Sequence, residues 1–175
     1  MLKSKGIIRL RQPHIKDLND LLNWENDILK IDHTDMPVFY TKDQMINYLN
    51  SSQDLLINGQ VRYMITLDEK SIGFIDLYDF DVVHSRAGIG IFLDKNFRRK
   101  GVAKKALVKL IEITKRELHL NQLFAEVFQS NKPAISLFKH VGFTLSGMKK
   151  QWIRKQEAYE DLLFLQLLNT QFQMY

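Results

Sequence analysis

One basic, glycine-containing segment, residues 96–105 (NFRRKGVAKK), constrains the fold more than any other part of the sequence. It follows a short apolar stretch, residues 87–93, whose length and composition are typical of a strand. After the segment, apolar side chains recur every three to four residues as far as Leu118, which is the period of an amphipathic helix. The segment therefore predicts a strand–loop–helix unit with Gly101 at the start of the helix.

The loop of this unit carries three cations, Arg98, Arg99 and Lys100, directly before the helix N-terminus. Cations are unfavourable there by roughly 0.3–1 kcal/mol each, so their concentration indicates a bound anion, although a solvated helix end is the alternative. The N–H groups of a first helical turn bind phosphate oxygens, and Gly101 lets a ligand approach the backbone. The sequence has neither a Gly-Lys-Ser/Thr loop nor the dinucleotide glycine pattern. We therefore expect a phosphorylated cofactor other than ATP or NAD.

The remaining pattern predicts further strands and helices on both sides of this unit. With residues 87–93, the expected strands are residues 7–11, 61–67, 71–78, 123–128, 144–153 and 159–168, with turns at 68–70 and 154–157. The expected helices are residues 15–28, 41–49, 101–118 and 131–142, where Thr41 and Asn131 are good N-caps and Gly142 is a natural C-terminal position. This order predicts an α+β fold in a single domain spanning residues 1–175.

Bulk properties exclude several classes of protein. The chain has no cysteine, which rules out disulfides, a thiolate nucleophile and sulfur-ligated metals, and its five histidines show no metal-ligand spacing. Residues 1–5 precede no apolar signal region, and the apolar run at 162–168 is too short to span a membrane. We expect a soluble cytoplasmic protein without a metal. The net charge of +5 favours an anionic partner, but no basic–aromatic motif of the RNA-binding kind supports nucleic acid.

Two motifs resemble those of the GNAT N-acetyltransferases. Arg98-x-x-Gly101-x-Ala103 resembles the family's Gln/Arg-x-x-Gly-x-Gly/Ala signature. Residues 131–143, NKPAISLFKHVGF, are similar to the family's Asn-x-x-Ala-x-x-Leu-Tyr-x-x-x-Gly-Phe at the usual distance downstream. Residues 9–11, 24–27 and 147–161 further resemble the branch that contains spermidine and ribosomal-protein alanine N-acetyltransferases. The resemblance covers nearly the whole chain, and it does not distinguish spermidine from ribosomal-protein acetyltransferases within that branch.

The resemblance implies a mixed, mostly antiparallel sheet of about seven strands with four helices, and acetyl-CoA bound where two parallel strands splay apart. It implies that the backbone of Ile91, Phe92 and Leu93 contacts the pantetheine arm, although a plain core strand is the alternative. The pyrophosphate would be held by Arg98, Arg99, Lys100, Gly101, Val102, Ala103 and Lys104. The thiol end would be bordered by Asn131, Ala134 and Phe138.

The sequence departs from the family pattern at two positions that bear on catalysis. Phe138 stands where many members have the tyrosine that protonates sulfur, and Gly88 stands where some spermidine enzymes have an acid. A general base is still required, because the attacking amine must be neutral. We rank Glu126 first, by its match to a base in some ribosomal-protein acetyltransferases, and Asp79 second; a surface role is the alternative for both. Further candidates for a base or an acidic acceptor pocket are Asp32, Asp35, Asp76, Asp81 and His84.

These features predict an enzyme that transfers acetyl from acetyl-CoA to a primary amine. The acceptor is expected to be a polyamine, a diamine or another small amine, with an N-terminal peptide as the alternative. A CoA-binding module without catalysis is a second hypothesis, motivated by Phe138 and Gly88. Nucleic acid and membrane are not expected as partners, and a homo-oligomer is compatible with the sequence.

Overall fold

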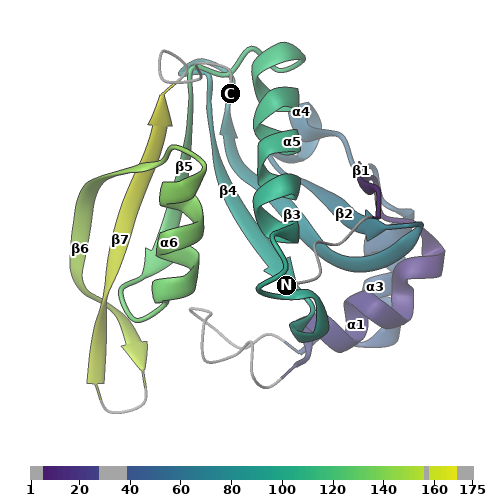
Figure 1. Ribbon diagram of the computed structural model, residues 1–175. Coiled ribbons are helices and arrows are strands. Elements are labelled where there is room, and N and C mark those ends of the chain that lie inside the picture. The colour runs from purple at the N-terminus through teal and green to yellow at the C-terminus, as the bar shows by residue number, and fades with distance from the viewer. Residues whose placement is uncertain (1–5, 28–38, 156–157, 169–175) are drawn as a thin grey trace.

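Seven strands form one sheet in the order β1-β2-β3-β4-β5-β7-β6 (Figure 1). The structure is a computed structural model and describes residues 6–27, 39–155 and 158–168. All neighbouring strands are antiparallel except β4 and β5, which are parallel. The strands are β1 (Ile8–Arg11), β2 (Val61–Leu67), β3 (Lys70–Asp81), β4 (Arg86–Leu93), β5 (Gln122–Phe128), β6 (Thr144–Lys155) and β7 (Ala158–Leu168). The predicted α+β fold with a mixed, mostly antiparallel sheet is confirmed.

Helices cover the two faces of the sheet unequally. On one face, α5 (Val102–Arg116) and α6 (Lys132–His140) pack against alternate strand residues such as Ile75 and Ile89 in the main core. On the other face, α1 (Leu18–Glu25) and α3 (Lys42–Asn50) pack against the intervening positions, among them Phe74 and Met64. Successive side chains of a strand point to opposite faces, so the two clusters are separate layers. The second layer covers the β2–β4 part of its face.

In the described part of the chain the four predicted helices are present, together with one α-helix that was not predicted, the single turn α4 (Leu55–Asn58). The first helix begins as the 3₁₀ turn η1 (Ile15–Asp17) and ends at Glu25, and residue 28, where we expected it to end, lies outside the described residues. Thr41 caps α3 and Asn131 caps α6, as predicted. The predicted turn at 154–157 lies partly outside the described residues.

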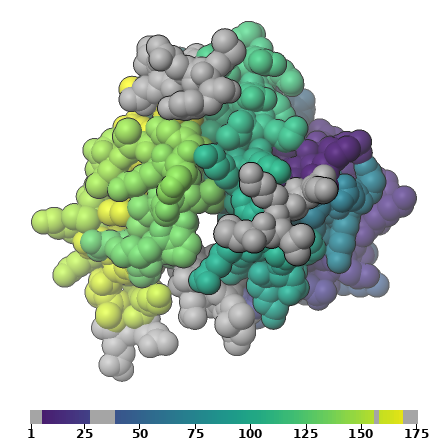
Figure 2. Space-filling view, in the orientation of Figure 1, coloured from purple at the N-terminus to yellow at the C-terminus, as the bar shows by residue number. Residues whose placement is uncertain are grey.

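Strands β4 and β5 pair over only a short distance and then diverge. In the described strands the parallel register joins Arg86–Gln122, Ala87–Leu123 and Gly88–Phe124 and continues no further. Toward the lower part of Figure 1 the two strands move apart, and α6 lies in front of β5. The space-filling view is open at the same place, between the green atoms around α6 and the teal atoms around the start of α5 (Figure 2). The splay that the family resemblance implied is therefore present.

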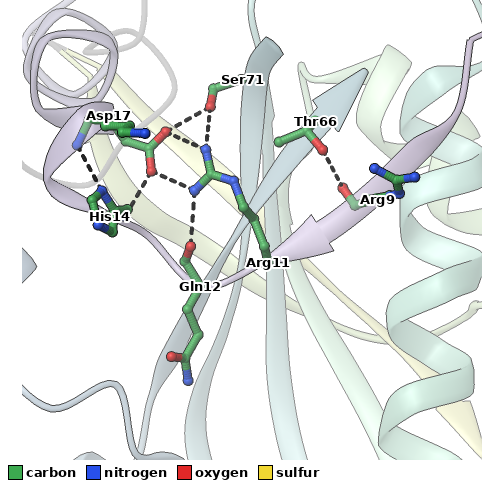
Figure 3. Close-up of polar contacts among 8 residues, drawn as sticks. Arg9, Arg11, Gln12, His14, Asp17, Thr66 and Ser71 are labelled. Atoms are coloured by element: carbon green, nitrogen blue, oxygen red, sulfur yellow. Dashed lines mark hydrogen bonds and ion pairs between the residues drawn. The ribbon is translucent and has the colours of Figure 1, made fainter. Parts of the chain in front are cut away.

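A partly buried ion pair fixes the first strand to the first helix (Figure 3). Arg11 at the end of β1 donates to both carboxylate oxygens of Asp17, at 2.6 and 2.7 Å, and also to the Ser71 hydroxyl. Ser71 and the His14 backbone N–H donate to the same carboxylate. Burial by itself would raise the pKa of Asp17, but these hydrogen bonds outweigh burial and hold its pKa below the ordinary value.

Candidate functional site

The backbone of β4 offers hydrogen-bonding groups to the splay. The Asp94 N–H donates to the Ile72 carbonyl of β3 at 2.9 Å, so position 94 forms a hydrogen-bonded pair with β3. Because such pairs alternate along an antiparallel ladder, the N–H and C=O groups of Leu93 and Ile91 point the other way, toward β5. At these positions β5 is no longer a partner. The backbone groups of Ile91 and the N–H of Leu93 therefore face the splay and suit an amide-rich ligand, and the pantetheine contacts of these residues stay a prediction.

Phe92, the third residue of this set, lies differently. Its backbone faces β3 in the same ladder, where it is paired with Phe74. Its ring stacks on the Phe74 ring at 5.2 Å and is 5.7 Å from the ring of Trp24. Trp24 is itself buried and belongs to the second core layer. The backbone of Ile89, which was not among the predicted contacts, has the same orientation as that of Ile91. Ile89 is therefore a better candidate than Phe92 for a backbone contact in the splay.

The mouth of the splay is formed by the loop before α5. Gly101 is the N-cap of α5 with a φ of 75°, and no side chain caps the first turn of this helix. Arg98 donates from Nε to the Leu93 carbonyl at 2.8 Å, which places its guanidinium at the open end of β4. Lys100 folds back and donates to the Asn96 carbonyl at 2.7 Å. The first-turn N–H groups of α5 and the adjacent cations form a suitable site for a pyrophosphate.

The other predicted phosphate contacts differ in accessibility. Arg99 is exposed and has a φ of 59°, and Lys104 is exposed on the first turn of α5. Val102 is buried in the main core, so only its backbone N–H can face a ligand. Ala103 is partly buried and packs against the same core. The segment thus combines backbone donors with exposed charge, as the sequence indicated.

The three residues predicted at the thiol end belong to α6 or to its N-cap, and each has a structural role there. The Asn131 side chain accepts a hydrogen bond from the Ala134 N–H at 3.1 Å, which caps the helix. Phe138 is 3% exposed, and its ring meets that of Phe143 edge-on at 5.1 Å. The phenylalanine at this position is therefore a core residue without a proton to give.

The closed end of the splay is lined by a tyrosine that sequence reasoning missed. Tyr78 on β3 is paired with Gly88 on β4, which is the last β4 residue paired with β5. A Cβ atom on Gly88 would lie 2.5 Å from Tyr78 Cζ, so the ring occupies the space above this glycine. The ring also meets the Phe124 ring of β5 edge-on at 5.7 Å. Gly88, at the position where the resemblance gave some spermidine enzymes an acid, is thereby explained, because no side chain fits at 88 with Tyr78 in this place.

The two predicted bases lie at different distances along the splay. Glu126 is two residues beyond the last β5 pair, on the same face as Phe124, and accepts a hydrogen bond from Lys149 of β6. This is the diverging part of β5. Asp79 is exposed, has a φ of 48° and lies in the bulge of β3 beyond Tyr78, past the closed end. Of the two, Glu126 is on the strand that lines the opening.

A pocket of about 630 Å³ adjoins Tyr78 on the α3 side of the sheet. Its lining includes three tyrosines, Tyr40, Tyr48 and Tyr78, together with an ion cluster. In that cluster Arg62 of β2 donates to both oxygens of Asp76 at 2.6 and 2.7 Å and to Glu25 at 2.5 Å. The Arg62 guanidinium also lies over the Phe74 ring, 3.7 Å from its centroid. We name Arg62, Asp76 and Glu25 the pocket cluster.

The electrostatics of this pocket follow from burial and from the two carboxylates. Burial alone would lower the pKa of Arg62, but Asp76 and Glu25 raise it above the ordinary value, so the guanidinium is always charged. Burial raises the pKa of Tyr48 to about 12, so this tyrosine stays neutral at physiological pH. Among the described residues that line the pocket, one guanidinium against two carboxylates leaves an excess negative charge, which favours a cationic ligand.

The remaining candidates are placed as follows. His84 pairs with Asp81 in the turn between β3 and β4, where both stabilise the turn. Asp32 and Asp35 lie outside the described residues. Within residues 6–27, 39–155 and 158–168, no group of three or more His, Asp or Glu side chains could hold a metal. No helix in the described part of the chain is long and apolar enough to cross a membrane, and the expected cytoplasmic location stays a prediction.

Comparison with known proteins shows likeness in sequence and in fold. A family model described as acetyltransferase (GNAT) domain matches residues 8–144. The uncharacterized N-acetyltransferase p20 of Bacillus licheniformis is 26% identical over 168 residues, which cover 94% of each chain. Among solved structures, spermidine N-acetyltransferase from Vibrio cholerae, in complex with CoA and spermine, has a TM-score of 0.85 and 19% identity, covering 94% of this chain and 96% of that one. RimL, a ribosomal L7/L12 α-N-protein acetyltransferase in complex with CoA, has a TM-score of 0.82 and 18% identity, covering 95% and 96%.

Proposed function

Because this chain belongs to the GNAT acetyltransferase family, we propose that it acetylates the primary amine of a small cationic molecule such as a diamine or polyamine. It is an acetyl-CoA-dependent N-acetyltransferase. The acceptor is the proposed part. The observation that carries it is the negatively charged, tyrosine-lined pocket beside the closed end of the splay.

The splay and the start of α5 together suit acetyl-CoA. Gly88 and Leu93 are five residue steps apart, which is about 17 Å of extended strand and comparable to an extended pantetheine arm. With the pyrophosphate at Gly101 and the cations around it, the arm follows the backbone of β4 from Leu93, whose carbonyl accepts from Arg98, past Ile91 to Ile89. The thioester then lies near Gly88, where the pocket begins.

The pocket suits a small amine for two reasons. The excess negative charge of the pocket cluster attracts an ammonium group, and Asp76 is 29% exposed, so it retains lone pairs for a ligand beside its bonds to Arg62. Tyrosine rings supply faces for cation–π contacts. A long polyamine can place one nitrogen at the thioester and another among these groups.

Glu126 is the proposed general base. Its carboxylate lies on the strand that opens beside the thioester, and the hydrogen bond from Lys149 orients it. It accepts the amine proton directly or through one water. Asp79 is the second candidate and acts through a longer water path, because it lies past the closed end.

The alternative acceptor is the N-terminal amine of a protein, which the fold likeness to RimL motivates. Thiol release from acetyl-CoA, measured over a panel of diamines, polyamines, amino acids and N-terminal peptides, distinguishes the two. We expect the highest kcat/KM with a diamine or polyamine. A clear preference for peptides would identify a protein N-terminus as the acceptor. CoA binding without amine-dependent thiol release would mean that the chain binds the cofactor without catalysis.

Substitution tests the two bases. Glu126→Gln should lower kcat about 10²-fold, the lower end of what a general base contributes, while the affinity for CoA stays the same. Asp79→Asn is the matched variant, because it likewise replaces a carboxylate by a neutral amide of similar shape, and it should lower kcat less. The reverse order in steady-state kinetics would assign the base to Asp79.

A further inference from the structure

We propose that the Tyr78 hydroxyl is the acid that protonates the departing CoA sulfur, an inference that rests on the proposed acetyl transfer. Acetyl transfer requires a proton for the thiolate, and the usual family donor is Phe138 here, a buried ring with no hydroxyl. Tyr78 brings a phenol to the same reaction from β3, at the closed end of the splay.

The placement of the phenol depends on two glycines of β4. Cζ of Tyr78, which carries the hydroxyl, lies above Gly88, and Cε1 would be 3.9 Å from a Cβ atom on Gly90. Both glycines are on the face of β4 that points to Tyr78, and each lacks the side chain that would keep the ring away from the strand. The ring therefore lies against the backbone of β4 at the point where β4 and β5 separate.

An aromatic row across the sheet holds the ring in this position. Tyr78 meets Phe124 of β5 edge-on, and Phe124 stacks on Phe164 of β7 with centroids 5.3 Å apart. Edge-to-face and stacked contacts of this kind fix the ring plane. A donor that is held in place needs little reorganisation when the thiolate forms.

The resemblance led us to expect an acid at position 88 in some relatives and a tyrosine at position 138, and this chain has neither. Tyr78 accounts for both differences. The ring fills the space that a side chain at 88 would need. Its hydroxyl replaces the one missing at 138. Tyr78 adjoins both the splay and the pocket, so it is at the border between cofactor and acceptor.

The step balances as follows. The amine nitrogen attacks the carbonyl carbon, the C–N bond forms and the C–S bond breaks, and the sulfur leaves with the electron pair. Tyr78 gives its O–H proton to the sulfur, which becomes the free thiol of CoA. The nitrogen, which must lose one proton to become an amide, gives that proton to Glu126 directly or through one water, and Glu126 passes it through water to the phenolate, so both groups return to their starting forms.

Tyr78→Phe tests the proposal, because it removes one oxygen and keeps the ring that packs on Phe124. We expect kcat to fall about 10²-fold, the lower end of what general acid catalysis contributes, with CoA affinity by calorimetry and the melting temperature unchanged. A fall of kcat at high pH that is present in the wild type and missing from the variant would be the signature of a proton donor. Tyr63→Phe is the matched control, since Tyr63 packs on the opposite face with the main core.

The outcomes separate this inference from the proposed function. Wild-type turnover on an amine with an unchanged kcat in Tyr78→Phe would overturn the role of Tyr78 and leave the function intact. A kcat loss accompanied by a lower melting temperature or weaker CoA binding would make Tyr78 a packing residue and also overturn the proposal. Absence of amine-dependent thiol release by the wild-type protein would overturn both.

Discussion

Two arginine–carboxylate clusters on this sheet use the same chemistry in opposite ways. Arg11 and Asp17 pair one charge with one charge, and the Asp17 side chain is 3% exposed. In the pocket cluster, Arg62 serves both Asp76 and Glu25, and Asp76 is 29% exposed. The first cluster joins β1, η1 and β3 and touches neither the pocket nor the splay. The second lines the pocket.

The difference lies in the number of charges and in what surrounds them. A buried carboxylate is tolerated when it has a cation and enough hydrogen bonds, and Asp17 has both. A second carboxylate on one guanidinium adds desolvation cost without balancing the charge, so stability alone does not favour it. The second carboxylate of the pocket cluster therefore agrees with the cationic ligand that we propose, whereas the Arg11–Asp17 pair is explained by the fold.

Asp17→Asn should produce the largest effect on stability. The amide keeps the shape but leaves Arg11 without its charge partner, and breaking a buried pair costs about 3–5 kcal/mol. Arg11 is 37% exposed and regains some hydration, so we expect a loss of about 2–3 kcal/mol. Urea denaturation measures it. KM for the amine should not change in the folded variant; a changed KM would mean that this cluster also serves the pocket.

The same pair predicts a pH dependence whose sign follows from the lowered pKa of Asp17. A carboxyl with a lower pKa in the folded state contributes stability above its unfolded pKa, about 3.9, and loses it as pH falls through the folded value. The stability difference between wild type and Asp17→Asn should thus stay constant from about pH 7 to 5 and shrink below about pH 4. A difference that grew on acidification would contradict the assignment.

Asp76→Asn should act mainly on the ligand. It removes the excess negative charge and one charge-assisted hydrogen bond, which is worth about 1.5–3 kcal/mol, so KM for a polyamine should rise about tenfold or more. The rise should be greater for an amine with more positive charges. Stability should fall less than in Asp17→Asn, because Glu25 still pairs with Arg62. A large stability loss without a change in KM would make the two clusters equivalent.

The sequence predicted the elements well because local chemistry decides them. Alternating apolar residues marked the strands, Thr41 and Asn131 began helices as caps, and Gly142 has the positive φ of 102° that its position required. The single turn α4 was missed because four residues are too few to show a helical period. The splay was predicted from the family resemblance alone, because no property of the strand residues indicates that two neighbouring strands will separate.

The pocket cluster and Tyr78 could not be read from the sequence, because they depend on register between distant segments. Arg62 meets Glu25 from 37 positions earlier and Asp76 from 14 positions later. Tyr78 faces Gly88 only because β3 and β4 pair with that register. One signal was available: glycines at 88 and 90 leave one face of a strand without side chains, which indicates that something large lies against it.

The exposed ion pair of Arg9 and Glu69 is a third case for the comparison, and its substitution should have the smallest effect on stability. Like the other two clusters it joins an arginine to a carboxylate, but its side chains are 58% and 75% exposed. Exposed pairs gain about 0.2–1 kcal/mol, because water screens the charges and the side chains lose rotamer freedom. Glu69→Gln should therefore change the free energy of unfolding by less than about 0.5 kcal/mol and leave KM unchanged. If urea denaturation showed a loss as large as that of Asp17→Asn, burial would not be what separates structural from superficial pairs in this fold.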